Sequence, residues 1–563
     1  MEEQLGLAEA VGELRSQLST IELPTDSPEA AEARRERTEL IDQIDDYVLP
    51  RLGRIDAPLL VVLGGSTGAG KSTITNSLVR DEVTTAGVLR PTTRAPVLVC
   101  HPDDQEWFMA EDGVLAGLPR TTSATAVGEV GLRVVTSTEL TPGLAMLDAP
   151  DIDSVEIANH DLAAQLLGAA DLWLFVTTAA RYADAVPWEY LELAVERSAA
   201  LAIVINRIPP GSEPEVAHHF GSMLSDRSLA GTTVFTIEES SLAEGRIGEA
   251  LMPVRNWLDD LAADSAERAA LVHATLDGAL SSFPDRVERV AAAADDHEER
   301  IENLRKVISR RYAQAIVDID GELDRGTLLR GEVLDQWREF VGTGAFMSKL
   351  EAGVSKVRDT IKSMFKSGPT PDQQAAGQLE SNLLVVTRDA VDRAAEDVVA
   401  AWEVTPLGEG ILAEAPRGID RAGKALTGSV EHELQAWQEY VLDLVRESSG
   451  DKLTLARTLS TGINGVGVAL MIAVFSQTGG LTGGEAAVAG GTAAVSQAVL
   501  TAVFGEQAVR DLARDARENL LDRLDTILKG DRQRFEELLG EAGEGAGESL
   551  RGAAEIVNTA RRS

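Results

Sequence analysis

The chain has 563 residues, and 52 lysines and arginines against 91 aspartates and glutamates leave a formal net charge of −39 at pH 7. This balance excludes a general nucleic-acid-binding protein, because such proteins need a cationic surface to neutralise phosphates. Hydrophobic residues make up 44% of the chain, which is enough for sizeable cores and excludes wholesale disorder.

The first 54 residues are predicted to be helical. One amphipathic segment runs to about Ile21, and a second begins near Glu29, after a Ser27-Pro28 pair that suits the start of a helix. We expect these helices, residues 1–54, to pack with a helical domain later in the chain. The N-terminal sequence shows no basic segment followed by an apolar one, and Cys100 is the single cysteine, so we expect a cytoplasmic protein without a disulfide.

Short apolar runs alternate with helical stretches between residues 55 and 250. The runs are Leu59–Leu63, Pro96–Cys100, Leu132–Val135, Leu144–Leu147, Leu172–Thr177, Leu201–Ile205 and Thr233–Ile237. Near-continuous apolar strands separated by helices are typical of a parallel sheet that is covered on both faces. The predicted fold class is therefore an α/β domain with a mostly parallel sheet.

Residues 251–563 contain long helical patterns and no convincing strand pattern. The patterns cover Val254–Ser281, Arg286–Phe340, Gln373–Val404, Glu431–Ser449 and a helix after Gly505, with breaks at Pro284, residues 367–371 and residues 406–416. We expect a large all-helical bundle or stalk with coiled-coil character.

A phosphate-binding pattern follows the first predicted strand. It reads Gly65-Ser66-Thr67-Gly68-Ala69-Gly70-Lys71-Ser72-Thr73 and matches G-x-x-x-x-G-K-[ST] between a strand and a helix. The glycines let backbone N–H groups converge on phosphates, Lys71 reaches the β- and γ-phosphates, and Ser72 offers a hydroxyl to Mg²⁺. The pattern predicts a P-loop fold that binds a nucleoside triphosphate with Mg²⁺.

Further residues complete the predicted catalytic and Mg²⁺ site around Lys71. Asp148 ends the apolar strand that begins at Leu144 and is expected to hold Mg²⁺, directly or through water. Thr92 or Thr93, about twenty residues after Lys71, is expected to contact Mg²⁺ and the γ-phosphate. Arg90 is either an arginine that stabilises transition-state charge or a solvated loop residue, and both alternatives stay open.

The segment Asp148-Ala149-Pro150-Asp151 resembles the D-x-P-G switch of translation-factor-class GTPases, with Asp151 in place of the glycine. Ile152 stands where many small GTPases have a glutamine that orients the attacking water. An apolar side chain cannot orient water, so hydrolysis uses another device or is slow.

The nucleotide base is expected to meet the segment Asn206-Arg207-Ile208-Pro209, which stands where an N/T-K-x-D motif reads guanine. Asn206 is in place and Arg207 is able to stack over a base, but Pro209 replaces the aspartate. Guanine preference is weakened unless another carboxylate substitutes, and the candidates are Glu213, Glu238 and Glu239. Both GTP and ATP stay open as the nucleotide.

Residues 58 to about 240 resemble the G domain of dynamin-like and Era-like GTPases, through Gly65–Ser72 and more loosely through Thr92, Thr93 and Asp148–Asp151. The helices before this domain and the long helical region after it look like bacterial dynamin-like proteins in particular. The resemblance implies GTP as the substrate, G domains that dimerise to activate hydrolysis, and a hydrophobic or basic tip that engages a membrane. It departs at Gly68, where dynamins carry a serine that takes part in catalysis.

Two segments are candidates for membrane contact. No charge occurs from Thr458 to Gly484, and a helix over Thr458–Thr478 would be ~31 Å long, close to the ~30 Å hydrocarbon thickness of a bilayer. Residues 458–505 therefore form either a glycine-hinged hairpin that enters a membrane or a hairpin buried in the helical domain. Residues 346–366 form a basic amphipathic helix that either lies on anionic lipid or packs its apolar stripe into a core.

Two functions follow. The leading one is a dynamin-like GTPase at the inner face of the cell membrane, which hydrolyses GTP with Mg²⁺ and couples dimerisation of its G domains to membrane association or remodelling. The alternative is a nucleotide-binding scaffold with little or no hydrolysis that docks a protein partner, or a P-loop protein that uses ATP.

Overall fold

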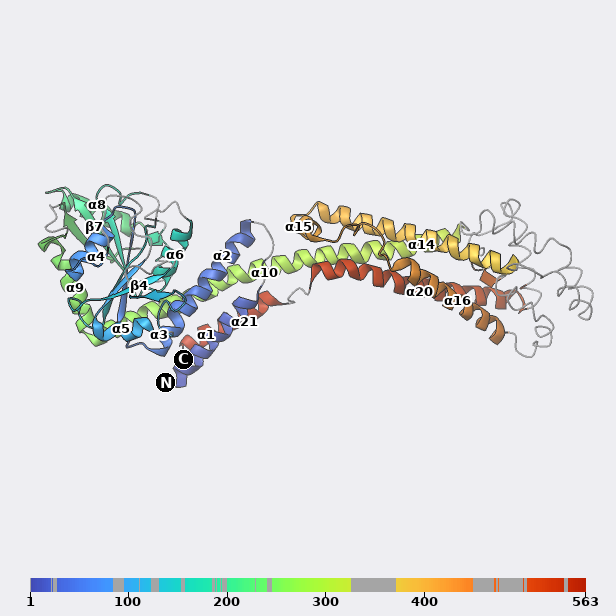
Figure 1. Cartoon of the computed structure of the whole chain (residues 1–563), viewed down its shortest axis with the longest axis horizontal. Coiled ribbons are helices and arrows are strands. Elements are labelled where there is room, and N and C mark those ends of the chain that lie inside the picture. The colour runs from blue at the N-terminus through green and yellow to red at the C-terminus, as the bar shows by residue number, and fades with distance from the viewer. Residues whose placement is uncertain are drawn as a thin grey trace, which may run out of the picture. The chain divides into compact units, whose positions relative to one another are not determined.

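Among the described residues, a mostly parallel sheet of eight strands forms the centre of the N-terminal half in the computed structural model, in the order β3-β4-β2-β5-β1-β6-β7-β8 (Figure 1). The neighbouring strands run parallel except β2 and β5, which pair antiparallel. This confirms the predicted fold class. The strands are β1 (Leu59–Gly65), β2 (Val97–Cys100), β3 (Arg120–Thr121), β4 (Leu132–Thr136), β5 (Leu144–Asp148), β6 (Leu172–Thr178), β7 (Ala200–Ile208) and β8 (Thr233–Glu238).

The structure describes residues 2–21, 23, 28–84, 96–110, 112–122, 131–152, 157–184, 188, 190–192, 194, 200–227, 229–239, 246–325, 371–448, 470–471, 474, 500, 504–540 and 545–562. Chain contacts divide it into two units, Met1–His297 with Gly543–Ser563, and Glu298–Ala542. The predicted domain limits at residues 54 and 250 both lie inside the first unit, and they stay predictions.

Alternate side chains of each central strand enter two different cores, as the period of two in a strand requires. Leu60 and Val62 of β1 face one core, while Leu59, Val61 and Leu63 face the other. Helices cover both faces, so every residue of β1 is buried. The helices and short turns around the sheet are α4 (Lys71–Val79), η2 (Pro102–Asp104), α5 (Gln105–Met109), α6 (Ile157–Gly168), α8 (Glu213–Ser225), η3 (Glu249–Leu251) and α9 (Met252–Ala263).

The N-terminal helices pack against helices from much later in the chain. They are α1 (Glu2–Thr20), α2 (Pro28–Gln43), the short π-helix η1 (Ile44–Val48) and α3 (Leu49–Gly53). Helix α1 lies beside the C-terminal helix α21 (Ala546–Arg562), as Figure 1 shows. Their apolar side chains, with those of the first part of α10 (Ser265–Asp324), join the core on one face of the sheet.

Two predicted features of the long helices are wrong. The break expected at Pro284 does not occur, because α10 continues through it. Phe283 and Val287 beside it are fully buried, and this packing offsets the helical hydrogen bond that proline lacks. Conversely, the single helix predicted over Val254–Ser281 is divided at Asp264. The Asp264 carboxylate caps α10 by accepting hydrogen bonds from the N–H groups of Ala266, at 2.8 Å, and Glu267, at 3.1 Å.

An acidic cluster at the end of α2 and in η1 gives a stability prediction. Burial, and then the charges of Asp46, Asp45 and Glu39, raise the pKa of Asp42 to about 6. The native state then binds a proton more tightly than the unfolded chain, so stability falls as pH rises from about 4 to about 6 and stays lowered at neutral pH. Asp42→Asn is expected to raise the melting temperature by roughly 2–4 °C near neutral pH and to give no gain near pH 4.

The check is thermal unfolding of the full chain at both pH values, with Asp112→Asn as the control because Asp112 is exposed. A lower melting temperature for Asp42→Asn near neutral pH would contradict the prediction.

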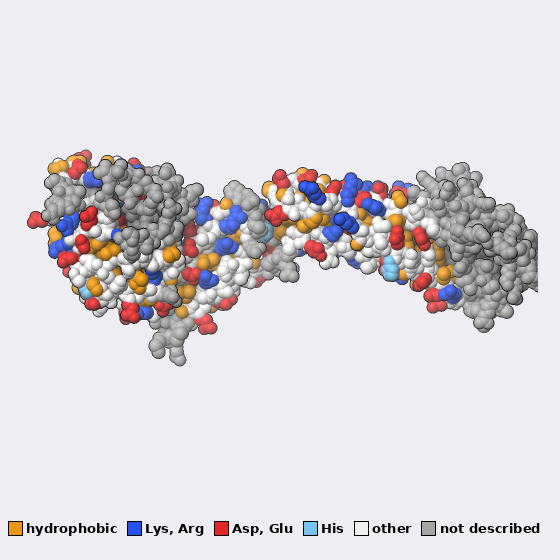
Figure 2. Space-filling model, viewed as in Figure 1, with side chains coloured by type: hydrophobic (Ala, Val, Ile, Leu, Met, Phe, Trp, Pro, Cys, Tyr) orange, Lys and Arg blue, Asp and Glu red, His pale blue; other side chains and the backbone are white. Residues whose placement is uncertain are grey.

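The described part of the second unit consists of helices around an apolar core. The last part of α10 packs with α14 (Pro371–Glu403), α15 (Pro406–Glu414), α16 (Leu426–Ser448) and α20 (Glu506–Leu539). Helix α15 occupies part of the break expected over residues 406–416, where Thr405 caps it by accepting from the Gly408 N–H at 3.1 Å. On the face drawn in Figure 2, basic and acidic side chains lie beside one another over the described part of this unit.

The two segments predicted to contact a membrane lie mostly outside the described residues. This holds for all of residues 346–366 and for most of residues 458–505. Leu470, Met471, Val474 and Leu500 are described, and they are buried in the core of the second unit. Among the described residues, no helix combines the length and apolar character needed to cross a bilayer.

Candidate functional site

The predicted phosphate loop lies between β1 and α4, where backbone conformation explains its glycines. Gly65 has φ of +149°, and a Cβ there would collide with the carbonyl oxygen of Val176 in the neighbouring strand β6. Gly70 has φ of +103°, and a Cβ there would lie 2.6 Å from Nδ2 of Asn206. These two positions require glycine because side chains have no room. The loop therefore keeps close contact with the ends of β6 and β7.

Lys71, the first residue of α4, is 5% exposed, and its ammonium group points back to the loop. Its Nζ donates to the carbonyl oxygens of Gly65, at 2.7 Å, and Ser66, at 3.5 Å. It also forms an ion pair with Oδ1 of Asp151 at 2.5 Å. A buried cation thus stands at the place where the motif expects a phosphate contact.

Ser72 and Asp148 meet although they are far apart in the sequence. The Ser72 hydroxyl donates to Oδ2 of Asp148 at 2.6 Å. Asp148 ends β5, which lies beside β1 in the sheet, so its fully buried carboxylate reaches the start of α4. Burial raises the pKa of Asp148 to about 6, against the opposing effects of the Ser72 hydrogen bond and the Lys71 charge.

Three buried polar atoms near the loop have no hydrogen-bond partner among the described residues. They are Oγ of Ser66 in the loop, Oδ1 of Asp148, and Oγ1 of Thr177 at the end of β6. Buried polar atoms are normally paired, so unpaired ones beside a phosphate loop indicate a place for a polar ligand. A carboxylate and a hydroxyl are oxygen ligands of the kind that Mg²⁺ prefers, so these residues fit a Mg²⁺-bound phosphate.

Asn206 and Arg207 lie at the end of β7, as predicted for the base-reading segment. The Asn206 Nδ2 donates to the Ala69 carbonyl oxygen at 2.9 Å, so its side chain holds the phosphate loop. Arg207 has a positive φ of 55° and is exposed. Of the proposed substitute carboxylates, Glu238 accepts from the Gly211 N–H at 3.0 Å, and Glu213 accepts from the Thr236 hydroxyl.

Ile152 is fully buried and belongs to the core, although its N–H bonds to the Gly65 carbonyl oxygen at 3.4 Å. Its backbone therefore lies beside the phosphate loop, while its side chain packs away from water. Sequence reasoning missed two other residues here. Thr84 donates to the Ser72 carbonyl oxygen at 3.3 Å, and Arg181, which follows β6, donates to the Thr67 carbonyl oxygen at 3.1 Å.

The predicted residues Arg90, Thr92 and Thr93 lie outside the described residues. The structure therefore brings together the loop from Gly65 to Thr73, Asp148 and Asn206, and leaves the contribution of the first-switch threonines as a prediction.

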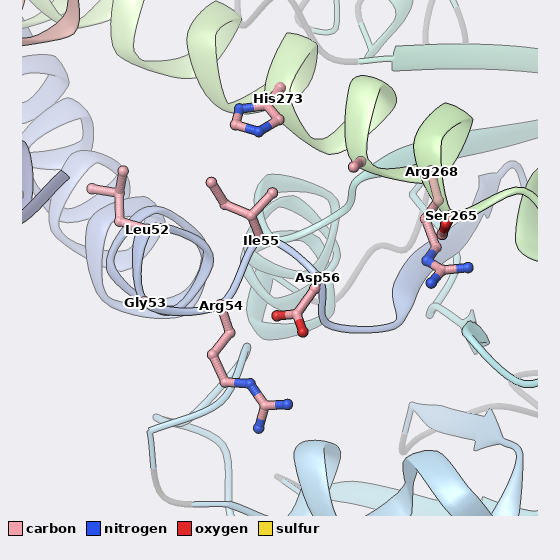
Figure 3. Close-up of a pocket in the computed structure, with 9 residues that line it drawn as sticks. Leu52, Gly53, Arg54, Ile55, Asp56, Ser265, Arg268 and His273 are labelled. Atoms are coloured by element: carbon pink, nitrogen blue, oxygen red, sulfur yellow. The ribbon is translucent and has the colours of Figure 1, made fainter. Parts of the chain in front are cut away.

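A surface cavity of about 430 Å³ lies elsewhere in the first unit, where α3 and the segment after it meet the start of α10 (Figure 3). Its nine lining residues include none from the phosphate loop or the ends of β5, β6 and β7. The phosphate loop carries the buried cation and the unpaired acceptors, so it and not this cavity is the candidate site. The lining residues are Leu52, Gly53, Arg54, Ile55, Asp56, Ser265, Arg268, Ala269 and His273.

No protein-family model and no curated protein matches the chain. Among solved structures, two chains from an oligomerised bacterial dynamin pair that senses and tethers membranes at long range are similar to it, with 11% and 10% identity and TM-scores of 0.38 and 0.35. The first comparison covers 94% of both chains, and the second covers 96% of both.

Two smaller GTPases are similar to part of the chain. Era, solved with MgGDPNP and a segment of 16S ribosomal RNA, is 17% identical over 32% of this chain and 51% of its own, with a TM-score of 0.22. Toc33 from Arabidopsis thaliana, solved with Mg²⁺ and GMPPNP, is 15% identical over 42% of this chain and 92% of its own, with a TM-score of 0.23.

At such identities and TM-scores these likenesses add no argument about the site, so the assignment of a P-loop domain rests on the sheet order, the loop and the Ser72–Asp148 contact.

Proposed function

We propose that the chain is a dynamin-like GTP-binding protein that hydrolyses GTP with Mg²⁺ and couples association of its G domains to contact with a membrane. One observation supports the nucleotide part above all others. The Ser72 hydroxyl and the Asp148 carboxylate meet at 2.6 Å beside the buried ammonium group of Lys71, at the end of a glycine loop. A strand, a glycine loop and a helix with this set of side chains suit a Mg²⁺-bound triphosphate.

Each residue has a proposed role. The backbone N–H groups from Gly65 to Thr73 and Lys71 bind phosphate, and Ser72 with Asp148 would hold Mg²⁺, to which Thr92 or Thr93 would add a ligand. Mg²⁺ supplies positive charge that offsets the negative charge of the phosphates. Arg207 stacks over the base, and Glu213, Glu238 or Glu239 replaces the aspartate that guanine recognition usually requires. We place the protein at the inner face of the membrane, with contact through residues 346–366 or through residues 458–505 other than Leu470, Met471, Val474 and Leu500, which are buried in the core of the second unit.

A scaffold with little hydrolysis is the second candidate, and the burial of Ile152 favours it. Its side chain is enclosed in the core, so nothing at that position orients an attacking water. Hydrolysis then needs another group or a second G domain.

Replacing Asp148 by asparagine is expected to abolish the part of the nucleotide affinity that depends on Mg²⁺. The amide keeps the shape of the side chain but loses the negative charge, so affinity in Mg²⁺ should fall roughly tenfold or more, and affinity in EDTA should not fall. Because burial raises the pKa of Asp148 to about 6, the Mg²⁺-dependent gain of the wild type should shrink as pH falls through that value. Titration of the full chain with a fluorescent GTP analogue measures both effects.

Asp103→Asn is the control, because that carboxylate is 79% exposed and lies outside the site. Equal Mg²⁺ dependence in wild type and Asp148→Asn would remove Asp148 from the site.

The proposed function as a whole is tested by GTP hydrolysis with and without anionic liposomes, over a range of protein concentrations. We expect the rate per molecule to rise with protein concentration and with liposomes. A slow rate that neither variable changes, in a protein that binds GTP, would favour the scaffold. Co-sedimentation with the same liposomes, compared with a deletion of residues 462–505, then tests the membrane contact separately.

A further inference from the structure

Asp151 stands where the D-x-P-G motif of the GTPases that this chain resembles has glycine. Its carboxylate forms an ion pair with the ammonium group of Lys71. Oδ1 of Asp151 is 2.5 Å from Nζ of Lys71, and the two side chains are 29% and 5% exposed. The contact joins residues that are 80 positions apart, so the sheet and the segment after β5 create it. This segment is attached to β1, since the Ala149 N–H bonds to the Leu63 carbonyl oxygen at 3.3 Å.

Among the described residues, each donor of Lys71 faces an acceptor, although the contact with Ser66, at 3.5 Å, is long for a hydrogen bond. An ammonium group has three N–H donors, and Lys71 meets three acceptors, namely the Gly65 and Ser66 carbonyl oxygens and the Asp151 carboxylate. A phosphate oxygen therefore has to replace one of them. The two carbonyl groups are part of the loop backbone, whereas Asp151 is a partly exposed side chain that can rotate away.

We propose that Asp151 is an intramolecular competitor of the nucleotide, whose carboxylate occupies the place at Lys71 that a phosphate oxygen takes. This inference rests on the proposed function, because it concerns the same phosphate site. While Asp151 is paired with Lys71, its charge cancels the attraction that Lys71 would exert on an incoming phosphate. The Asp151 carboxylate also repels the phosphate. That repulsion grows with phosphate charge, so Asp151 weakens the binding of a triphosphate more than that of a diphosphate.

The same neighbourhood contains the other carboxylate of the site. After burial and the contacts with Ser72 and Lys71, the charge of Asp151 contributes to the raised pKa of Asp148. Two carboxylates therefore lie beside the phosphate loop, one at Ser72 and one at Lys71. Asp148 is held by Ser72, and Asp151 by Lys71. Replacing Asp151 removes its contribution to the pKa of Asp148 but no contact between Ser72 and Asp148, so titration in EDTA separates its effect at Lys71 from any effect on Mg²⁺.

The test is a titration of the full-length, nucleotide-free protein with fluorescent mant-GMPPNP and mant-GDP, each in Mg²⁺ and in EDTA. The variants are Asp151→Asn, which removes the charge, and Asp151→Gly, which restores the residue of the resembling motif. Glu139→Gln is the matched control, because it removes one negative charge from a half-exposed ion pair with Arg80 on the same domain. Melting curves of all variants verify that they are folded.

We expect both Asp151 variants to bind mant-GMPPNP at least tenfold more tightly than wild type, in Mg²⁺ and in EDTA, with a smaller gain for mant-GDP and none for Glu139→Gln. If wild type binds and the Asp151 variants bind no more tightly, the competitor role is overturned while the proposed function stands. Weaker binding of the variants in Mg²⁺ alone would overturn it too, and would make Asp151 a support for Mg²⁺. Absence of binding in every variant would overturn both the competitor role and the proposed function.

Discussion

Replacing Lys71 by alanine is expected to lower the affinity for the nucleotide about 100-fold. Lys71 is the buried cation of the phosphate loop, and hydrogen bonds to charged groups each contribute about 1.5–3 kcal/mol, where about 1.4 kcal/mol corresponds to a factor of ten. Contact with both the β- and γ-phosphates then accounts for the size of the loss. The measurement is a binding titration of the full chain with a fluorescent GTP analogue.

The control for this experiment is Lys529→Ala, which removes a lysine that is 62% exposed on α20 and pairs with Asp525. It should leave the nucleotide affinity unchanged. If wild type and Lys71→Ala are both folded and bind the nucleotide with similar affinity, the nucleotide binds at a site other than the phosphate loop.

Replacing Arg51 by methionine is expected to destabilise the first unit by about 3–5 kcal/mol. The side chains of Arg51 and Asp171 are fully buried and form an ion pair. Arg51 also donates to the carbonyl oxygens of Ala57, at 3.2 Å, and Pro58, at 2.8 Å, while Asp171 accepts from the Leu60 N–H at 2.7 Å. Loss of the guanidinium leaves these acceptors and a buried carboxylate without their partner, which is far more costly than losing a surface ion pair.

The comparison variant is Arg551→Met, because Arg551 pairs with Glu288 and Asp295 at the surface. The expected fall in melting temperature is on the order of 10 °C for Arg51→Met, and much smaller for Arg551→Met. The double variant Arg51→Met with Asp171→Leu should recover part of the loss, since it removes the unpaired charge. Equal effects of the two single variants would contradict this account of the buried pair.

The fold class could be predicted from the sequence because the central strands are buried on both faces, so their sequences are unbroken apolar runs. All seven predicted runs are strands in the sheet. Strand β3 was missed because Arg120 and Thr121 are only two residues and carry no apolar pattern. The continuity of α10 through Pro284 was missed for a different reason. Tertiary packing of Phe283 and Val287 overrides a local preference, and the local sequence does not show that packing.

The candidate site was accessible in part. The spacing from Gly65 to Ser72 indicated the loop, and the position of Asp148 at the end of an apolar strand indicated that it would reach Ser72. The ion pair of Lys71 with Asp151 and the hydrogen bond of Asn206 to Ala69 were not predictable, because loop conformation in three dimensions decides them. The same holds for Arg51 and Asp171, which are 120 positions apart.

The central claim is that this chain binds a guanine nucleotide at its phosphate loop and that the binding depends on Mg²⁺. The most direct test is a paired titration of the full-length protein with fluorescent GTP and ATP analogues, in Mg²⁺ and in EDTA. The account predicts tighter binding of the GTP analogue, a gain from Mg²⁺, and loss of this binding in Lys71→Ala. Binding of the ATP analogue at least as tightly as the GTP analogue, with no effect of Lys71→Ala, would contradict it.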